Sequence, residues 1–152
     1  MIRKTLQCAC LALVASVAMA GDAEVKSLTQ DAFLSLPRQG ADAPFVLDVR
    51  TPEEYASGYV PGAVNIPHDQ VAARLAEVPK DKEVVVYCRS GRRALMAADV
   101  LASNGYKDLA HLQGDIIAWM ENSRPLEKPK DPAACIAALK SGEPATAACA
   151  GN

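Results

Sequence analysis

The residue best placed for covalent chemistry is a cysteine within a basic run, Cys88-Arg89-Ser90-Gly91-Arg92-Arg93. The thiolate is the reactive form of cysteine. It is favoured here by guanidinium groups, by the start of a following helix and by unpaired backbone N–H groups. Gly91 allows the backbone to curl so that these N–H groups converge on one anionic atom, and Ser90 offers a hydroxyl donor. The residues alone leave a structural alternative open, in which Cys88 is a packed strand-end residue beside a solvated helix start.

This run lies between a predicted strand and a predicted helix. Residues 83–87 predict a buried strand, and residues 92–104 have the apolar spacing of a helix that ends at Gly105. Further strands are predicted at 25–27, 45–49 and 109–112, and further helices start near Thr29 and Thr51, at 68–78 and at 116–120. Strands alternating with helices predict an α/β domain, with a mostly parallel sheet covered on both faces and catalytic groups where strands end.

Four motifs occur in order along the chain: LDVR at 47–50 with Glu54 close behind, GYVPGAVNIP at 58–67, CRSGRR at 88–93, and LQG at 112–114 with Trp119. In this order and at these spacings the chain resembles the rhodanese family, over roughly residues 24–122. Tyr59 and Val60 stand where His and Ile are common in the family, and Asp115 stands where a second glycine is usual.

The resemblance implies a three-layer α/β/α fold with a central mostly parallel sheet, and a sulfur-transfer mechanism without a cofactor. Cys88 would attack the outer sulfur of a small donor such as thiosulfate and become a persulfide. A thiol or cyanide acceptor would then take the outer sulfur of that persulfide. The backbone from Arg89 to Arg93 would hold the persulfide anion, Arg93 would close the loop, and Arg89 and Arg92 would attract an oxyanionic donor. Arg50 and Glu54 match a structural ion pair of the family, and Asp48 lies near the loop.

The length of the loop favours sulfur transfer over a related chemistry. Four residues separate Cys88 from Arg93, which resembles the sulfur-transfer members of the family. Related phosphatases and arsenate reductases have one residue more, which makes a wider cradle for a tetrahedral oxyanion. A second alternative stays open, because a persulfide carrier that serves a protein partner, such as a thiol-redox or sulfur-relay protein, needs the same loop.

The first 20 residues have the pattern of a secretory signal peptide. Arg3 and Lys4 precede an apolar run at 8–17, and Ala18-Met19-Ala20 is a small-residue exit before Gly21. We therefore expect export, to the bacterial periplasm, with no membrane attachment after cleavage. The predicted organisation is a signal peptide at 1–20, the rhodanese-like domain at 21–126 and a short helical C-terminal extension at 127–152.

Export leaves three cysteines: Cys88, Cys135 and Cys149. In an oxidising compartment two of them can pair, and the two in the extension are close in sequence. We predict that a disulfide between Cys135 and Cys149 clips a small helical hairpin, whose first helix starts at Asp131-Pro132 and whose second starts near Pro144. The alternative is a redox role, in which one of these two cysteines resolves the Cys88 persulfide.

Other functions find little support in the sequence. The formal net charge is −2 and no block rich in Lys or Arg occurs, so nothing points to nucleic acid. His68 and His111 are far apart and have no further ligands at a metal-binding spacing, so we expect no metal.

Overall fold

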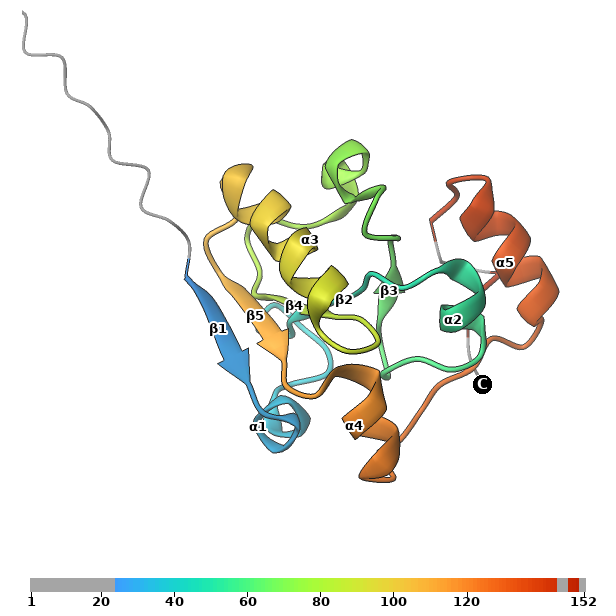
Figure 1. Cartoon of the computed structure of the whole chain (residues 1–152), viewed down its shortest axis with the longest axis horizontal. Helices are drawn as coiled ribbons and strands as arrows, with labels where there is room; N and C mark the ends of the chain where they lie inside the picture. The colour runs from blue at the N-terminus through green and yellow to red at the C-terminus, as the bar shows by residue number, and fades with distance from the viewer. Residues whose placement is uncertain (1–23, 145–147, 151–152) are drawn as a thin grey trace, which may run out of the picture.

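The computed structural model describes residues 24–144 and 148–150. In this part of the chain five strands form one parallel sheet: β1 (Val25–Leu28), β2 (Phe45–Asp48), β3 (Val64–Asn65), β4 (Val84–Tyr87) and β5 (Leu109–Leu112). Their order across the sheet is β1-β5-β4-β2-β3, which makes β4 the central strand (Figure 1). All four residues of β4 are buried, as its apolar sequence predicts. The predicted α/β class with a mostly parallel sheet is confirmed.

Helices cover both faces of the sheet and create two buried clusters. One face packs against α3 (Arg92–Ser103) and two 3₁₀ turns, η1 (Val71–Ala73) and η2 (Leu75–Glu77). The other face packs against α1 (Gln30–Ser35), α2 (Pro52–Ala56), α4 (Asp115–Glu121) and α5 (Pro132–Lys140). Alternate residues of β4 serve the two clusters: Val84 and Val86 face α3, whereas Val85 and Tyr87 face the other side.

The start of α2 is set by its own sequence. Thr51 accepts a hydrogen bond from the backbone N–H of Glu54, and the Glu54 carboxylate accepts one from the backbone N–H of Thr51. With Pro52 in the first turn, this capping box satisfies the first free donors of the helix. The start of the helix predicted at Thr51 is therefore confirmed, and Glu54 is held at a defined position.

The predicted helix at 68–78 is wrong. The segment instead forms η1 and η2, with Val71 and Val78 buried as the apolar spacing indicates. An α-helix would need an N–H four residues after Leu75, and that residue is Pro79, which has none. The Leu75 carbonyl accepts from the backbone N–H of Val78 and from the hydroxyl of Tyr106.

The described part of the extension contains one helix, α5, which Asp131 caps and after which Gly142 adopts φ 80°. Residues 148–150 form a turn, so Cys149 does not lie in a helix. The first helix of the predicted hairpin is thus present. The second helix, predicted to start near Pro144, falls on residues 145–147, which lie outside the described residues, as does the predicted signal peptide. Among the described residues, no helix is long and apolar enough to cross a membrane.

Candidate active site

Cys88 follows the last residue of β4 and lies at the turn into α3. Cys88 is 1% exposed and belongs to the buried cluster on the α3 side of the sheet. Gly91 adopts φ 97°, a left-handed conformation that glycine takes without steric cost. Its backbone N–H therefore turns back on the cysteine, and the nitrogen lies 3.1 Å from the Cys88 Sγ. The sulfur thus receives a hydrogen bond from the loop at the carboxyl edge of the sheet.

The arginines of the loop have different environments. Arg89 and Arg92 are exposed, as is Ser90, whereas Arg93 is half-buried. Arg93 makes two contacts with the carboxylate of Glu54, at 2.6 Å from Nη1 to Oε2 and 2.9 Å from Nη2 to Oε1. The Arg93 guanidinium lowers the pKa of Glu54 to about 2, and the Glu54 carboxylate in turn raises the pKa of Arg93. Helix α2 therefore holds the end of the cysteine loop.

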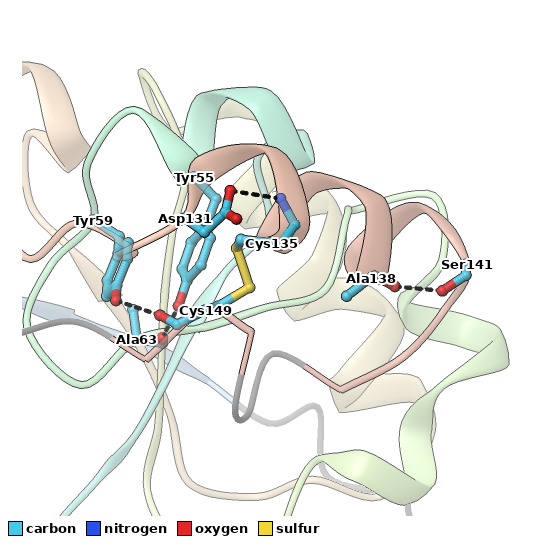
Figure 2. The surroundings of a disulfide bond; sticks show 9 residues. Tyr55, Tyr59, Ala63, Asp131, Cys135, Ala138, Ser141 and Cys149 are labelled. Carbon is cyan, nitrogen blue, oxygen red and sulfur yellow. Dashed lines mark hydrogen bonds between the residues drawn. A yellow bond between two sulfur atoms is a disulfide. The ribbon is translucent and has the colours of Figure 1, made fainter.

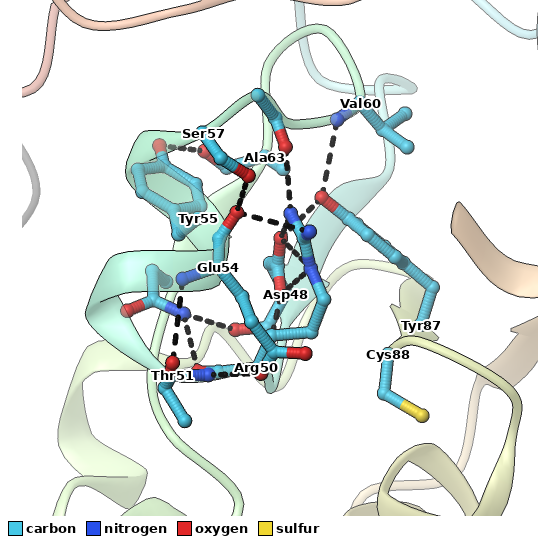
Figure 3. Close-up of polar contacts among 12 residues, drawn as sticks. Asp48, Arg50, Thr51, Glu54, Tyr55, Ser57, Val60, Ala63, Tyr87 and Cys88 are labelled. Atoms are coloured by element: carbon cyan, nitrogen blue, oxygen red, sulfur yellow. Dashed lines mark hydrogen bonds and ion pairs between the residues drawn. The ribbon is translucent and has the colours of Figure 1, made fainter. Parts of the chain in front are cut away.

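Arg50 does not form the ion pair with the Glu54 carboxylate that the resemblance implies. Its guanidinium donates to the buried Asp48 carboxylate at 2.5 Å and to the backbone carbonyl of Gly58 at 2.9 Å. Its contact with Glu54 is to the backbone carbonyl, at 3.1 Å, and not to the carboxylate (Figure 3). Asp48 is 0% exposed, so its charge needs a cation close by more than the half-exposed Glu54 does. Burial raises the pKa of Asp48, and the hydrogen bonds from Arg50 oppose that rise.

Tyr87 connects the Asp48–Arg50 pair to the strand that carries the cysteine. Its hydroxyl donates to Asp48 Oδ2 at 2.5 Å and accepts from the backbone N–H of Val60 at 3.1 Å. Burial and the Asp48 charge raise the pKa of Tyr87 well above its usual value, so the hydroxyl stays a donor. Figure 3 shows this network on one side of Cys88. Asp48 and Arg50 thus brace the strand ends next to the loop.

Two residues at the loop were missed as site residues in the sequence. Asp115, the first residue of α4, accepts the backbone N–H of Cys88 through Oδ1 at 2.8 Å, and its Oδ2 lies 3.0 Å from His111 Nε2. The signal was present, because an aspartate replaces the glycine that is usual after Gly114. For His111 the sequence offers no comparable signal, because its contact with Asp115 depends on the fold. Within the described residues, no group of three or more His, Cys, Asp or Glu side chains is arranged to hold a metal.

A cavity of about 360 Å³ opens beside the loop, between α2 and α4. Arg89 connects it to the cysteine loop. The cavity combines cationic, anionic and apolar groups, and it is lined by Arg50, Glu54, Ser57, Arg89, Ile116, Ile117, Met120 and Glu121. A pocket with such a lining is a candidate binding site for a small molecule next to the cysteine loop.

Cys135 and Cys149 form a disulfide (Figure 2). Cys88 is a free thiol. Both disulfide residues belong to the buried cluster on the α2 side of the sheet, whereas Cys88 belongs to the cluster on the α3 side. The Tyr59 hydroxyl donates to the Cys149 carbonyl at 2.9 Å. The extension is thereby packed onto the domain, away from the cysteine loop.

Comparisons with known proteins agree with this architecture. A family model described as a Rhodanese-like domain matches residues 29–122. A sulfurtransferase of Allochromatium vinosum is 42% identical over 98 residues, which cover 63% of this chain and 92% of that protein. YrkF of Bacillus subtilis, proposed to be a sulfur carrier protein, is 36% identical over 74 residues, 49% of this chain and 40% of that protein. The crystal structure of a rhodanese-related protein from Thermoplasma volcanium superposes with a TM-score of 0.59 at 27% identity, covering 66% of this chain and 96% of that one.

Proposed function

The chain belongs to the rhodanese-like domain family, and we propose that it moves sulfane sulfur from a donor such as thiosulfate to a thiol or cyanide through a persulfide on Cys88. Family membership and the similarity to sulfurtransferases support transferase chemistry. The identities of the donor and the acceptor belong to the proposal.

The proposed reaction has two balanced steps. The Cys88 thiolate attacks the outer sulfur of thiosulfate, a new S–S bond forms, and the old S–S bond breaks with its electron pair leaving on sulfite. An acceptor thiolate or cyanide then attacks the outer sulfur of the persulfide. The Cys88 thiolate leaves and is ready for the next cycle. No redox cofactor is needed, because each step replaces one bond to the transferred sulfur by another, and no electrons enter or leave the reacting groups.

The observation that carries the proposal is the hydrogen bond from the Gly91 N–H to the Cys88 Sγ at 3.1 Å. A backbone donor aimed at the sulfur stabilises the negative charge on it when it attacks the donor and when it leaves the persulfide. Arg89 and Arg92 are exposed on the same loop and can attract an oxyanionic donor. Arg93 is held by Glu54, so in this proposal it closes the loop from one side.

The loop length supports sulfur transfer over phosphate or arsenate chemistry. With four residues between Cys88 and Arg93, the short loop already brings one N–H to 3.1 Å from the bare sulfur. A tetrahedral oxyanion bound above the sulfur would need a wider ring of donors. The phosphatase and arsenate reductase alternatives are therefore not favoured.

A persulfide carrier for a protein partner is the second candidate. The similarity to YrkF favours it. We also propose that the protein is exported to the periplasm, supported by the leader-like pattern of residues 1–20 and by a disulfide of the kind that persists in oxidising compartments.

Intact mass before and after treatment with thiosulfate tests the proposal. The protein should gain the mass of one sulfur atom and Cys88→Ser should gain none; equal gains, or none in either protein, would refute the assignment. Steady-state turnover with thiosulfate and cyanide then distinguishes the two candidates, because a carrier should take up one sulfur and turn over slowly. The mass of the secreted protein measures whether residues 1–20 are removed.

A further inference from the structure

A buried carboxylate lies behind the cysteine loop, and the proposed reaction does not use it. Asp115 is 2% exposed and adopts φ 54°, a left-handed conformation that glycine takes freely and that aspartate and asparagine adopt more often than other residues. It is the first residue of α4, far in sequence from Cys88. A buried carboxyl group is costly unless its oxygens find hydrogen-bond partners.

The contacts of Asp115 join three parts of the site. Oδ1 accepts the backbone N–H of Cys88 at 2.8 Å, and Oδ2 lies 3.0 Å from His111 Nε2, on β5. A Cβ added to Gly91 would lie 3.2 Å from the same Oδ2, so the carboxylate is packed against the turn of the loop. The next residue, Ile116, donates its backbone N–H to the Cys88 carbonyl at 3.2 Å. Both backbone polar groups of Cys88 are thus hydrogen-bonded to α4.

Asp115 contacts the backbone of Cys88, whereas Gly91 donates a hydrogen bond to the sulfur. A contact to the backbone acts on the geometry of the cysteine. By accepting the Cys88 N–H, Asp115 fixes the peptide plane that precedes the side chain, and the loop can turn until the Gly91 N–H faces the sulfur.

We propose that Asp115 is a positioning residue for Cys88, and that His111 supports it by holding the second carboxylate oxygen. This inference rests on the proposed function, because the geometry it protects is that of the attacking sulfur. Asp115 and His111 support the loop from α4 and β5, outside the run from Cys88 to Arg93.

The test compares single-turnover rates of sulfur uptake from thiosulfate in five proteins: the unmodified protein, Asp115→Gly, Asp115→Asn, His111→Ala and the double variant Asp115→Gly/His111→Ala. Glycine accepts the left-handed φ but removes the acceptor, so Asp115→Gly should slow uptake by roughly tenfold, as expected for a lost hydrogen bond to a charged group. Asparagine keeps an acceptor oxygen, so Asp115→Asn should stay within about threefold of the unmodified rate. His111→Ala should slow uptake alone but not further in the Asp115→Gly background, since it acts through Asp115.

Tyr106→Phe is the matched control, because it also removes buried hydrogen bonds, in this case those from the Tyr106 hydroxyl to the carbonyls of Leu75 and Val78 at η2, away from the loop. It should lower the unfolding free energy and leave the uptake rate unchanged. Four outcomes would each overturn the inference. Asp115→Gly takes up sulfur as fast as the unmodified protein, or Asp115→Asn takes it up as slowly as Asp115→Gly. Alternatively, the losses in the double variant are additive, or Tyr106→Phe loses as much rate as Asp115→Gly. If D115G does not fold, an unmodified rate in His111→Ala overturns it. Alkylation of Cys88 by iodoacetamide should follow the same order of rates, so the geometry is tested even if the unmodified protein takes up no sulfur and the proposed function itself fails.

Discussion

The carboxylate of Glu54 and the guanidinium of Arg93 form a two-point contact that joins α2 to the first turn of α3. The two residues are 39 positions apart in sequence. Paired contacts between arginine and carboxylate fix orientation as well as distance. The last residue of the cysteine loop is therefore positioned by a helix that is itself held by a capping box.

Replacing Glu54 by glutamine should weaken this contact without breaking the helix start. Glutamine can still accept the Thr51 N–H, so the capping box is kept, but the charged partner of Arg93 is lost. We expect kcat/KM for sulfur transfer to fall by about three- to tenfold, on the scale of one charge-assisted hydrogen bond. Glu53→Gln is the control, since its carboxylate pairs with Lys140 on α5 and not with the loop. Equal losses in both variants would contradict the role given to Glu54.

The same contact predicts a dependence of stability on pH. The pKa of Glu54 is lowered from 4.5 to about 2 by Arg93, so the folded protein binds this proton more weakly than the unfolded chain does. The resulting stabilisation is complete above pH 4.5 and is lost as the pH falls towards 2. Urea unfolding across this range should therefore show a difference between the unmodified protein and Glu54→Gln that shrinks on acidification. A constant difference would show that the shift in the pKa of Glu54 does not contribute.

Lengthening the cysteine loop should reduce sulfur transfer. One glycine inserted between Gly91 and Arg92 moves Arg93 out of register with Glu54 and widens the ring of backbone donors. We expect thiosulfate turnover to fall by at least about tenfold, since one misplaced group at a reacting centre costs that much or more. Any gain should be towards phosphate or arsenate. The control is one glycine inserted after Gly40, in an exposed turn; full turnover in a folded loop variant would show that loop length does not decide the chemistry.

The disulfide between Cys135 and Cys149 should stabilise the protein without taking part in the reaction. The two cysteines are 14 positions apart, and closing a loop of that size contributes roughly 3 kcal/mol. Cys135→Ser/Cys149→Ser should lose about that much unfolding free energy and keep its sulfur-transfer rate, because Cys88 packs on the opposite face of the sheet.

Thiol counting on the denatured, unreduced protein after removal of residues 1–20 should give one free thiol, Cys88. Peptide mapping should link the two segments of the extension. If the map instead links Cys88 to either cysteine in most molecules, the structural role is wrong, and the alternative in which a cysteine of the extension resolves the persulfide takes its place.

Much of the fold is predictable from the sequence because the determinants are local. The run Val84–Tyr87 is apolar throughout and forms the buried central strand. Thr51 and Pro52 cap and start a helix within three residues, and Gly91 permits the turn that aims its own N–H at Cys88. Each depends on neighbours a few positions away, so the pattern of residues contains the information. The helix predicted at 68–78 fails for a reason that is only partly local: Pro79 withholds a donor, and the Tyr106 hydroxyl arrives from another segment.

The partners of the charged residues were decided by the tertiary structure. The motif suggests that Arg50 pairs with Glu54, yet burial gives Arg50 to Asp48 and leaves Glu54 to Arg93. In the sequence, Asp115 is noticeable only because it replaces a glycine that is usual in the family. Folding brings it to the backbone of Cys88, 27 positions away. A sequence shows which groups are charged, but the partner of each is the group that folding brings within about 3 Å and shields from water, where ion pairing and hydrogen bonding are strongest. The reactive cysteine and its loop can therefore be predicted from the sequence, whereas the groups that support the loop are determined by the packing of α2, α4 and β5 around it.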